Sequence, residues 1–499
     1  MPRFAKIAPW TLPLLSGALG GLAQANETGA FLSFFALVPL FFFWHYAPSP
    51  FSALIGGWSA ASIALAIETT WLFELLPIPW MPAVSDVSAA IFMLFAWSLT
   101  SFSVGAPFAL VSVLAYKAIQ RNIRWWPLFA LALWIAAEYA SSWIPAALWV
   151  GAETSIHPIT FGNIGYALAN FPALLSLSRW GSIYILSSTL FAVNWFVFLI
   201  YRRFLGQPRK ATLAVLATAV AISLIPSLPG PSSSSHQGQL APTTIALVSS
   251  NIPSWAEATQ TDKQIIKENL GLALAKLARE NVDAVIFPES AHVLNLFDKT
   301  FLESLFKNGR TIIIDNSVVR DPRAEGSLRS RLFAYEPASG NVVASWDKSF
   351  LFFGGEYPPL LLTSWARFFG FNEVLRRYAA TSYSPGEGNE RPVPIGSHFA
   401  AISLCTQSWA PQFFLNQTRM GADLLINLSS DALFHGAKFY LWERLLMLKV
   451  RAAENGAYLL HAANGSSSLV IDPTGKILES VEARERFSYA YKVITLPAK

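Results

Sequence analysis

The stretch GSIYILSSTLFAVNWFVFLIY, residues 181–201, contains no charged residue. A helix that crosses a lipid bilayer needs about 20 mostly apolar residues, because the hydrocarbon core is about 30 Å thick. Arg202 and Arg203 follow the stretch directly, and basic residues typically flank the cytoplasmic end of a span. The stretch therefore predicts a membrane-spanning helix and sets the fold class of this half of the chain.

The composition of the whole chain agrees with a membrane protein. Of its 499 residues 53% are hydrophobic and only 13% are charged, and the mean hydropathy is +0.40. Soluble domains average about 25% charged residues, and disordered chains need high charge, so both classes are excluded. Residues 1–228 contain six acidic residues, which are Glu27, Glu68, Glu74, Asp86, Glu138 and Glu153. We predict seven spans in this half, at 8–25, 29–46, 52–73, 88–116, 125–143, 181–201 and 211–228.

The basic residues of this half predict its orientation. They form three clusters, which are Arg3 and Lys6; Lys117, Arg121 and Arg124; and Arg202, Arg203, Arg209 and Lys210. Seven spans place all three clusters on one side, which the positive-inside rule makes cytoplasmic. Residues after 228 are then expected outside the cytoplasm. Glu138 lies within a span, where a carboxyl group is costly and is expected to be functional or paired.

A Pro-, Gly- and Ser-rich segment at 229–241 predicts a linker between a transmembrane domain, 1–228, and a soluble domain, 242–499. Apolar strand-like runs then alternate with helix-like segments, which predicts a layered α/β or α+β domain. The expected strands include 243–250, 283–289, 311–319, 331–336, 341–346, 399–405, 422–430, 457–464, 466–472 and 489–496. The expected helices are about 260–280, 297–307 and 437–455.

Three of these strands end in a residue that can do chemistry. Glu289 follows DAVIFP, Lys348 follows NVVASWD, and Cys405, the only cysteine of the chain, ends FAAISLC. Taken singly, each has a structural reading: an exposed glutamate, a surface lysine, or a cysteine buried as a small hydrophobic residue. Together they supply a base, an oxyanion donor and a nucleophile, which are the groups that acyl transfer requires.

The sequence indicates no cofactor. Its seven histidines are scattered without a helix-spaced pair, and it has neither a phosphate-binding P-loop nor a dinucleotide fingerprint after a strand. We therefore expect no metal. The net charge of +5 could suggest nucleic-acid binding, but the basic surplus lies largely in the loops between spans, so we expect no nucleic-acid partner.

Several motifs resemble one family. They are VSSNIP (248–253), DKSFLFFGGEYPP (347–359), GADLLINLSSDALF (421–434) and VRAAENGAYLLHAANGSSSLVIDPTG (450–475). They resemble segments of the apolipoprotein N-acyltransferase family, the membrane-bound members of the nitrilase (carbon–nitrogen hydrolase) superfamily. The resemblance implies a helical membrane bundle followed by an αββα sandwich with a Glu–Lys–Cys triad, here Glu289, Lys348 and Cys405.

The resemblance also implies a reaction. Cys405 takes a fatty acyl chain from a phospholipid as a thioester, and passes it to the α-amino group of the N-terminal diacylglyceryl-cysteine of a lipoprotein. Glu289 is then the base, and Lys348 stabilises the oxyanion. The expected partners are a phospholipid donor and a lipoprotein acceptor, and the expected location is the bacterial inner membrane, with the catalytic domain on its periplasmic side.

Further residues are expected to support substrate binding. They are Glu356, Tyr357, Thr406, Gln407, Trp409, Arg179 and Trp180. Arg179 and Trp180 precede a span and suit either phospholipid head groups or simple interfacial anchoring. The apolar loop 350–370 is either a lid that dips into the membrane surface or a loop packed on the domain.

Two features depart from the family pattern. The family commonly has Cys-Tyr-Glu where this chain has Cys405-Thr406-Gln407, and it usually ends in a further span, which we expect this chain to lack. The alternatives are a diverged paralogue with another acceptor or an accessory role, as in conjugal transfer, a membrane-bound amidase that uses water, and a non-catalytic membrane protein.

Overall fold

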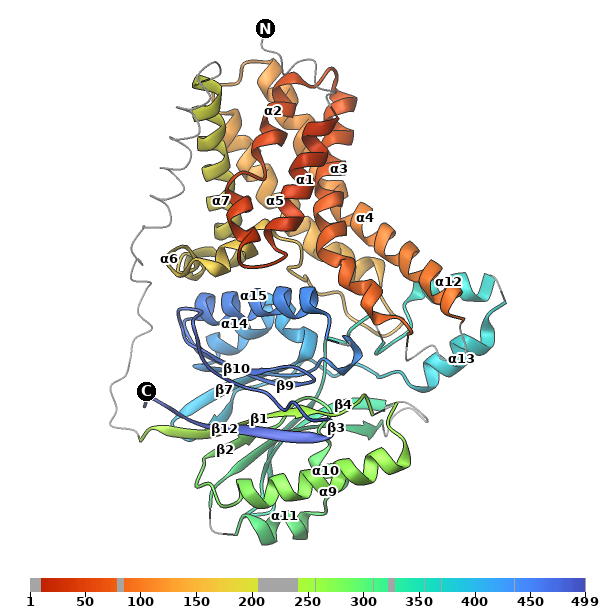
Figure 1. Ribbon diagram of the computed structural model, residues 1–499, viewed down its shortest axis with the longest axis vertical. Coiled ribbons are helices and arrows are strands. Elements are labelled where there is room, and N and C mark those ends of the chain that lie inside the picture. Colours follow the sequence, from red (N-terminus) through yellow and green to blue (C-terminus); the bar gives the residue numbers. More distant parts are fainter. Residues whose placement is uncertain are drawn as a thin grey trace.

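The computed structural model describes residues 10–78, 85–204 and 241–498, except 256, 308, 322–327, 354, 369 and 435. A bundle of apolar helices stands on a layered α/β domain (Figure 1). The predicted span 211–228 and residues 229–240 of the predicted linker lie outside the described residues.

The bundle is built from helices of very different length. Its α-helices are α1 (Thr11–Ala23), α2 (Val38–Tyr46), α3 (Pro50–Glu68), α4 (Asp86–Gln120), α5 (Trp126–Leu148), α6 (Pro172–Leu175) and α7 (Ser178–Arg203). Among the described residues, three 3₁₀ segments join them, η2 (Gly29–Phe34), η3 (Thr69–Leu75) and η4 (Ile164–Asn170).

The prediction of seven spans is wrong. Among the described residues, five helical segments are long and apolar enough to cross a membrane, namely Gly29–Tyr46, Pro50–Leu75, Asp86–Gln120, Trp126–Leu148 and Ser178–Arg203. Helix α1 has 13 residues, and a rise of about 1.5 Å per residue makes it about 20 Å long, which is shorter than the hydrocarbon core. Helix α4 has 35 residues and is far longer than a bilayer requires.

Small residues allow the helices of the bundle to approach closely. A Cβ atom on Gly17 of α1 would lie 2.5 Å from the carbonyl oxygen of Ala60 on α3, and one on Gly57 would lie 1.9 Å from Oγ of Ser112 on α4. In a membrane the lipid tails are as apolar as leucine, so such close packing is what holds helices together. The glycines are therefore part of the bundle's core.

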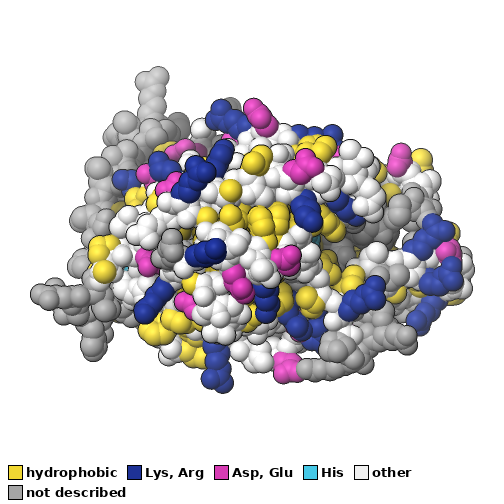
Figure 2. All heavy atoms as spheres, turned by 90° about the horizontal axis from the view of Figure 1, so that it is seen from below, with side chains coloured by type: hydrophobic (Ala, Val, Ile, Leu, Met, Phe, Trp, Pro, Cys, Tyr) yellow, Lys and Arg dark blue, Asp and Glu magenta, His cyan; other side chains and the backbone are white. Residues whose placement is uncertain are grey.

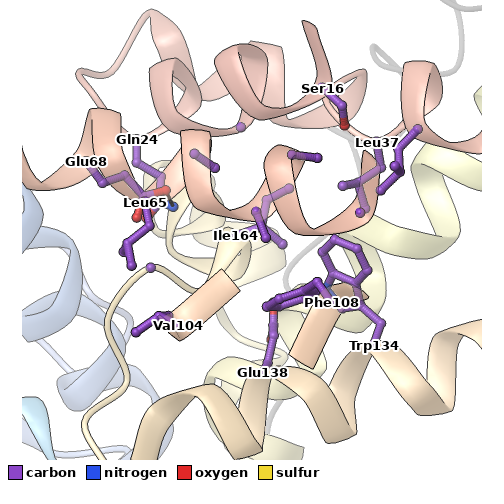
Figure 3. A pocket seen from close by; sticks show the side chains of 17 residues that line it. Ser16, Gln24, Leu37, Leu65, Glu68, Val104, Phe108, Trp134, Glu138 and Ile164 are labelled. Atoms are coloured by element: carbon purple, nitrogen blue, oxygen red, sulfur yellow. Dashed lines mark hydrogen bonds between the residues drawn. The ribbon is translucent and has the colours of Figure 1, made fainter. Parts of the chain in front are cut away.

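A cavity of about 60 Å³ lies between α1, α3, α4 and α5 (Figure 3). Gln24 and Glu68 lie at one end of it, and Glu138 lies on another wall. Nε2 of Gln24 donates to Oε1 of Glu68 over 2.6 Å, while Trp134 and Asn163 donate to the two oxygens of Glu138 over 3.1 and 3.0 Å. Glu138 is therefore paired, which is one of the two expectations for a carboxyl group within a span.

The second half of the chain is rich in strands. They are β1 (Thr243–Asn251), β2 (Ala284–Ile286), β3 (Ile312–Arg320), β4 (Leu328–Glu336), β5 (Asn341–Asp347), β6 (Val393–Ile395), β7 (His398–Leu404), β8 (Leu424–Ser430), β9 (Tyr458–Asn464), β10 (Ser468–Ile471), β11 (Ile477–Val481) and β12 (Ser488–Leu496). The helical elements are α9 (Gln260–Leu277), α10 (Val293–Leu296), α11 (Lys299–Leu305), α12 (Leu360–Phe368), α13 (Asn372–Ala380), η5 (Cys405–Trp409), α14 (Pro411–Arg419), η6 (Ala432–Phe434) and α15 (Lys438–Asn455).

The strands form two packed layers. The strand order is β5-β4-β3-β2-β1-β9-β8-β7-β6, with β12 paired to β1 and β10 to β9. Alternate residues of one strand enter different cores: Ile245 of β1 packs between the layers, and Ala246 packs toward α9. Across the domain, Ile426 of β8 shares the inner core, while Leu425 packs toward α14 and α15. This is the predicted αββα sandwich.

Helix α15 lies between the sandwich and the bundle (Figure 1). Nη2 of its Arg451 donates to Oγ1 of Thr160 over 2.7 Å and to the hydroxyl of Tyr166 over 2.8 Å. Nε1 of Trp71 in turn donates to Oε2 of Glu443 over 3.1 Å. These buried contacts attach the domain to one end of the bundle.

The far face of the domain has the character of a surface in water. Figure 2, seen from the end opposite the bundle, shows basic and acidic side chains interspersed with small hydrophobic areas. The loop between α4 and α5, with its basic residues, and the end of α7 lie at the other extreme of the molecule (Figure 1). There Arg202 on α7 contacts His45 on α2 over 3.4 Å.

Candidate active site

The three residues predicted from strand ends come from both layers of the sandwich. Glu289 follows β2 by three residues, Lys348 follows β5 directly, and Cys405 follows β7 directly as the first residue of η5. Strands β1 and β2 are parallel in one layer, and β7, β8 and β9 are parallel in the other. The loops at the carboxyl ends of these strands meet at one edge of the sandwich.

The structure brings the three side chains together. Nζ of Lys348 lies 3.2 Å from Oε1 of Glu289 and 2.7 Å from Oε1 of Glu356. The thiol of Cys405 is hydrogen-bonded to the carboxylate of Glu289. Lys348 and Glu289 are buried, with 1% and 7% of their surfaces exposed, while Cys405 is partly accessible. A base, a cation and a thiol are therefore in contact within one site.

Glu356 is the second carboxylate in contact with Lys348. Its second oxygen, Oε2, accepts a hydrogen bond from the main-chain N–H of Phe352 over 2.6 Å. Both oxygens of the carboxylate are thus engaged, which fixes its position at the ammonium group. The supporting role expected for Glu356 therefore takes the form of a second anion on Lys348.

The backbone at the cysteine is in an unusual conformation. Cys405 has a φ of 47°, in the left-handed region that non-glycine residues seldom adopt outside functional sites. Nδ2 of Asn427 donates to the Cys405 carbonyl oxygen over 3.0 Å, and Oγ of Ser429 lies 3.7 Å from Sγ. These contacts hold the sharp turn that directs the thiol toward the glutamate and the lysine.

Burial and charge set the protonation states of the site. Burial, opposed by the charge of Lys348, raises the pKa of Glu289 above its usual range. Burial, helped by the negative charge of Glu289, raises the pKa of Cys405 to about 12. The thiol is therefore neutral near pH 7 and needs a base to react, and a buried glutamate with a raised pKa suits that task. Burial opposes the charge of Lys348, but Glu289 and Glu356 outweigh it, so its pKa is raised.

We expect Glu356→Gln to shift the pH dependence of thiol reactivity. The negative charge of Glu356 raises the pKa of Glu289, so its removal should lower that pKa and leave Glu289 ionised at lower pH. In the pH profile of the rate of Cys405 alkylation by iodoacetamide, the acidic limb should move to lower pH by about one unit. Glu390→Gln, which removes a carboxylate that is bonded to Ser349 rather than to Lys348, should leave the limb in place. An upward shift for Glu356→Gln would contradict this account.

The residues predicted beside the triad lie around it in different ways. Gln407 is buried; its Oε1 accepts from the N–H of Leu404 over 2.8 Å, and its Nε2 donates to Oγ of Ser349 over 3.2 Å. It thus joins the cysteine loop to the lysine loop. Thr406 is also buried. Trp409 stacks on Phe161 with ring centres 6.2 Å apart, against the bundle.

Tyr357 and Arg179 bind the domain to the bundle. The hydroxyl of Tyr357 donates to the carbonyl oxygen of Trp149 over 2.9 Å. Arg179 donates to the carbonyl oxygens of Ala453 and Pro473 over 3.3 and 3.1 Å. The guanidinium of Arg179 is used in this contact, and its role at phospholipid head groups stays a prediction. Trp180 is 66% exposed, as an interfacial anchor would be.

A buried ion pair that the sequence did not predict lies behind the thiol. Asp431 and Arg444 pair directly, and both are almost completely buried. Oγ of Ser466 donates to Oδ2 of Asp431 over 2.5 Å, and Oγ of Ser429 lies 3.4 Å from Oδ1. Asp431 belongs to the motif GADLLINLSSDALF, so the resemblance contained the signal, but spacing alone did not single it out.

The segment predicted as a loop at 350–370 contains helix α12, and α13 follows it. Its large apolar side chains are exposed, with Phe368 at 85%, Trp365 at 44% and Leu360 at 45%. Both helices lie beside the lower end of α4 (Figure 1), where Val87 and Ile91 are 71% and 63% exposed. Such a large exposed apolar surface typically marks a contact with membrane or protein. We call α12 and α13 the apolar arm.

Comparisons with known proteins agree with this arrangement. Residues 339–491 match the family model for carbon-nitrogen hydrolases. Apolipoprotein N-acyltransferase of Azotobacter vinelandii is 25% identical, covering 95% of this chain and 87% of the relative. Those of Geobacter metallireducens and Gloeobacter violaceus are 24% and 25% identical, covering 96% and 92% of this chain and 88% and 83% of the relatives.

Solved structures resemble the second half of the chain. Saccharomyces cerevisiae Nit3, of the nitrilase superfamily, is 18% identical over 51% of this chain and 90% of its own, with a TM-score of 0.37. An amidase from Nesterenkonia sp. is 17% identical over 52% of this chain and 93% of its own, with a TM-score of 0.36. This chain is therefore similar over nearly its whole length to relatives named apolipoprotein N-acyltransferase, and its residues 339–491 match the carbon-nitrogen hydrolase family model.

Proposed function

We propose that the protein moves a fatty acyl chain from a phospholipid to the α-amino group of an N-terminal diacylglyceryl-cysteine, through a thioester on Cys405. The observation that carries the proposal is the contact of Lys348 with Glu289 and Glu356, beside a thiol hydrogen-bonded to Glu289. The names of the relatives supply the substrate class.

In the first step Glu289 takes the proton of the Cys405 thiol as sulfur attacks the ester carbonyl carbon of the phospholipid. The ammonium of Lys348 stabilises the negative oxygen of the tetrahedral intermediate. The bond to the glycerol oxygen then breaks, and Glu289 returns the proton to that oxygen. A lysophospholipid leaves, and the acyl group remains on sulfur.

In the second step the α-amino group of the acceptor attacks the thioester carbonyl carbon. Glu289 accepts a proton from the attacking amine, and Lys348 again faces the oxyanion. The carbon–sulfur bond breaks, Glu289 returns its proton to the sulfur, and the free thiol is restored. Together the two reaction steps form one amide and break one ester, and they need no external oxidant or energy source.

The position of the site suits lipid substrates. Lifting a lipid from a bilayer costs about 0.8 kcal/mol per CH₂ group, so the thiol must be reached from the membrane. The loops around it contact the end of the bundle: the N–H of Leu360 donates to the carbonyl oxygen of Val150 over 2.8 Å, and that of Thr160 to the carbonyl oxygen of Trp409 over 3.2 Å. We infer that the apolar arm rests in the interface there.

The expected orientation places the catalytic domain outside the cytoplasm. The basic loop between α4 and α5 and the basic end of α7 lie at the end of the bundle far from the domain (Figure 1). The positive-inside rule favours the cytoplasm for that end. In a bacterial inner membrane the domain would then face the periplasm.

The proposal is tested by incubating the purified full chain with phospholipid vesicles and a diacylated lipopeptide. Mass spectrometry should show the lipopeptide gaining the mass of one acyl chain, and a lysophospholipid appearing in equal amount. Omission of phospholipid, or alkylation of the single cysteine beforehand, should abolish the gain. Release of free fatty acid without any acylated lipopeptide would overturn the transferase proposal in favour of a hydrolase.

We expect Phe368→Asp in the apolar arm to weaken the use of membrane-bound donor. Burying an aromatic side chain contributes about 1.5–3 kcal/mol, so KM for vesicle phospholipid should rise at least about tenfold. For a short-chain phospholipid supplied below its critical micelle concentration, the KM of the variant should equal that of the wild type. Leu272→Asp, at an exposed position on α9 away from the bundle, is the matched control. Equal losses on both donors would show that the arm acts on the site itself.

A further inference from the structure

A polar hollow of about 400 Å³ opens beside the candidate active site, where β1, β8 and β9 end. Its lining includes Asn251, Glu257, Asp431, Gly436, Gly465 and Arg486. Strands β7, β8 and β9 are parallel neighbours, so the hollow lies at the same edge of the sandwich as Cys405. Pockets of a few hundred Å³ are typical ligand sites.

The hollow is connected to the thiol by a short chain of contacts. Asp431 lines it, and Oδ1 of Asp431 lies 3.4 Å from Oγ of Ser429. That Oγ in turn lies 3.7 Å from Sγ of Cys405. The hollow therefore lies close to the thiol, separated from it by the buried side chains of Ser429 and Asp431.

The walls of the hollow are suited to a peptide. Gly436 and Gly465 both have a φ of 78° and present main chain without a side chain. The floor is held firmly, because Asn464 accepts from the N–H of Ile252 over 2.9 Å and donates to its carbonyl oxygen over 3.0 Å. Glycine allows a ligand to approach the backbone closely, so an extended peptide can pass over these two positions.

Charges of both signs line the same hollow. Glu257 is exposed, and the side chain of Arg486 is 71% exposed. Arg486 lies 3.9 Å from Asp262 and over the ring of Phe487 at 4.5 Å. Both charged groups remain accessible to a ligand. This polar lining contrasts with the exposed aromatic surface of the apolar arm.

We propose that the hollow receives the peptide segment that follows the acylated cysteine of the acceptor. The inference rests on the proposed function, because only a lipopeptide acceptor has to place an amine at the thiol, lipid chains in the membrane and a polar peptide in water. The apolar arm and bundle serve the lipid chains, and the hollow is the polar route away from the same carbon.

The test uses acceptors that differ only in the peptide. Two diacylglyceryl lipopeptides carry Asp or Lys at the positions after the cysteine, and a third acceptor is the diacylglyceryl-cysteine amide without a peptide. Arg486→Glu should shift the ratio of kcat/KM toward the Lys lipopeptide by about two- to fivefold, as expected for one exposed charge pair. Glu257→Lys should shift it toward the Asp lipopeptide. The peptide-free acceptor should react equally with all variants.

Arg484→Glu is the matched control, because Arg484 lies two residues away with its side chain 86% exposed and is not part of the lining. It should leave the ratio unchanged. The inference is overturned if Arg486→Glu leaves the ratio unchanged, or if it slows the peptide-free acceptor to the same degree. A wild-type chain that forms no acyl-enzyme with phospholipid would instead refute the proposed function, so the two failures are distinguishable.

Discussion

Replacing Cys405 by serine is expected to reduce acyl transfer by about 10⁴-fold or more. A hydroxyl is far less acidic than a thiol, so Glu289 cannot generate a comparable nucleophile from it, and loss of a nucleophile is among the largest effects of any single substitution. The chain has a single cysteine, so no other thiol can substitute. Intact-protein mass spectrometry with phospholipid alone should show a hydroxylamine-sensitive acyl adduct on the wild type and none on Cys405→Ser.

The fold should be unaffected by this change. Serine is nearly isosteric, and its hydroxyl can keep the polar contacts that the sulfur makes with Glu289 and Ser429. The thermal unfolding midpoint in detergent should therefore stay close to that of the wild type. An acyl adduct that persists on the serine variant at the wild-type rate would place the nucleophile elsewhere and contradict the mechanism.

Replacing Lys348 by methionine is expected to damage both activity and stability. The ammonium is the cation between Glu289 and Glu356, and breaking a buried ion pair by removing one partner typically costs about 3–5 kcal/mol. Loss of an oxyanion donor costs a further factor of about 10²–10³ in kcat. Thermal unfolding and single-turnover formation of the acyl-enzyme measure the two losses separately.

The double variant Lys348→Met, Glu356→Gln separates the two roles of the lysine. The single variant Lys348→Met leaves the carboxylates of Glu289 and Glu356 without their cation. Removing the charge of Glu356 should restore part of the lost folding stability, because fewer buried charges are then left without a partner. Activity should stay low, since the ammonium is still missing. If stability and activity recovered together, the lysine would act only as a structural counter-ion, and its role at the oxyanion would be disproved.

The alternation of apolar runs was enough to locate most of the catalytic domain. The run expected at 243–250 is β1 (Thr243–Asn251), and the helix expected at 437–455 is α15 (Lys438–Asn455). Both are long and strongly patterned, so local sequence determines their type. Short elements were missed: β6 has three residues, and its strand character comes from pairing with β7 rather than from its own pattern.

The composition was enough to locate the membrane half, but the number of spans predicted from it was wrong. Hydropathy measures how apolar a stretch is and not whether it stays helical, so 8–25 read as a span although α1 ends at Ala23 after 13 residues. The arm was read as a loop for a related reason. Pro358 and Pro359 suggest irregular chain, but α12 begins directly after them at Leu360, since proline is tolerated where a helix begins.

The sequence by itself indicated an apolar helical half followed by an α/β half, and it singled out Glu289, Lys348 and Cys405 as candidates, because hydrophobic periodicity and residue chemistry are properties of short stretches. Only the tertiary structure showed that Glu356 forms a second ion pair with Lys348. It also showed that Arg179 is used in the contact between domain and bundle, and that Asp431 lies behind the thiol. Those residues come from segments far apart in the chain. Their distances follow from how the two sheet layers and α15 pack, which no local pattern encodes.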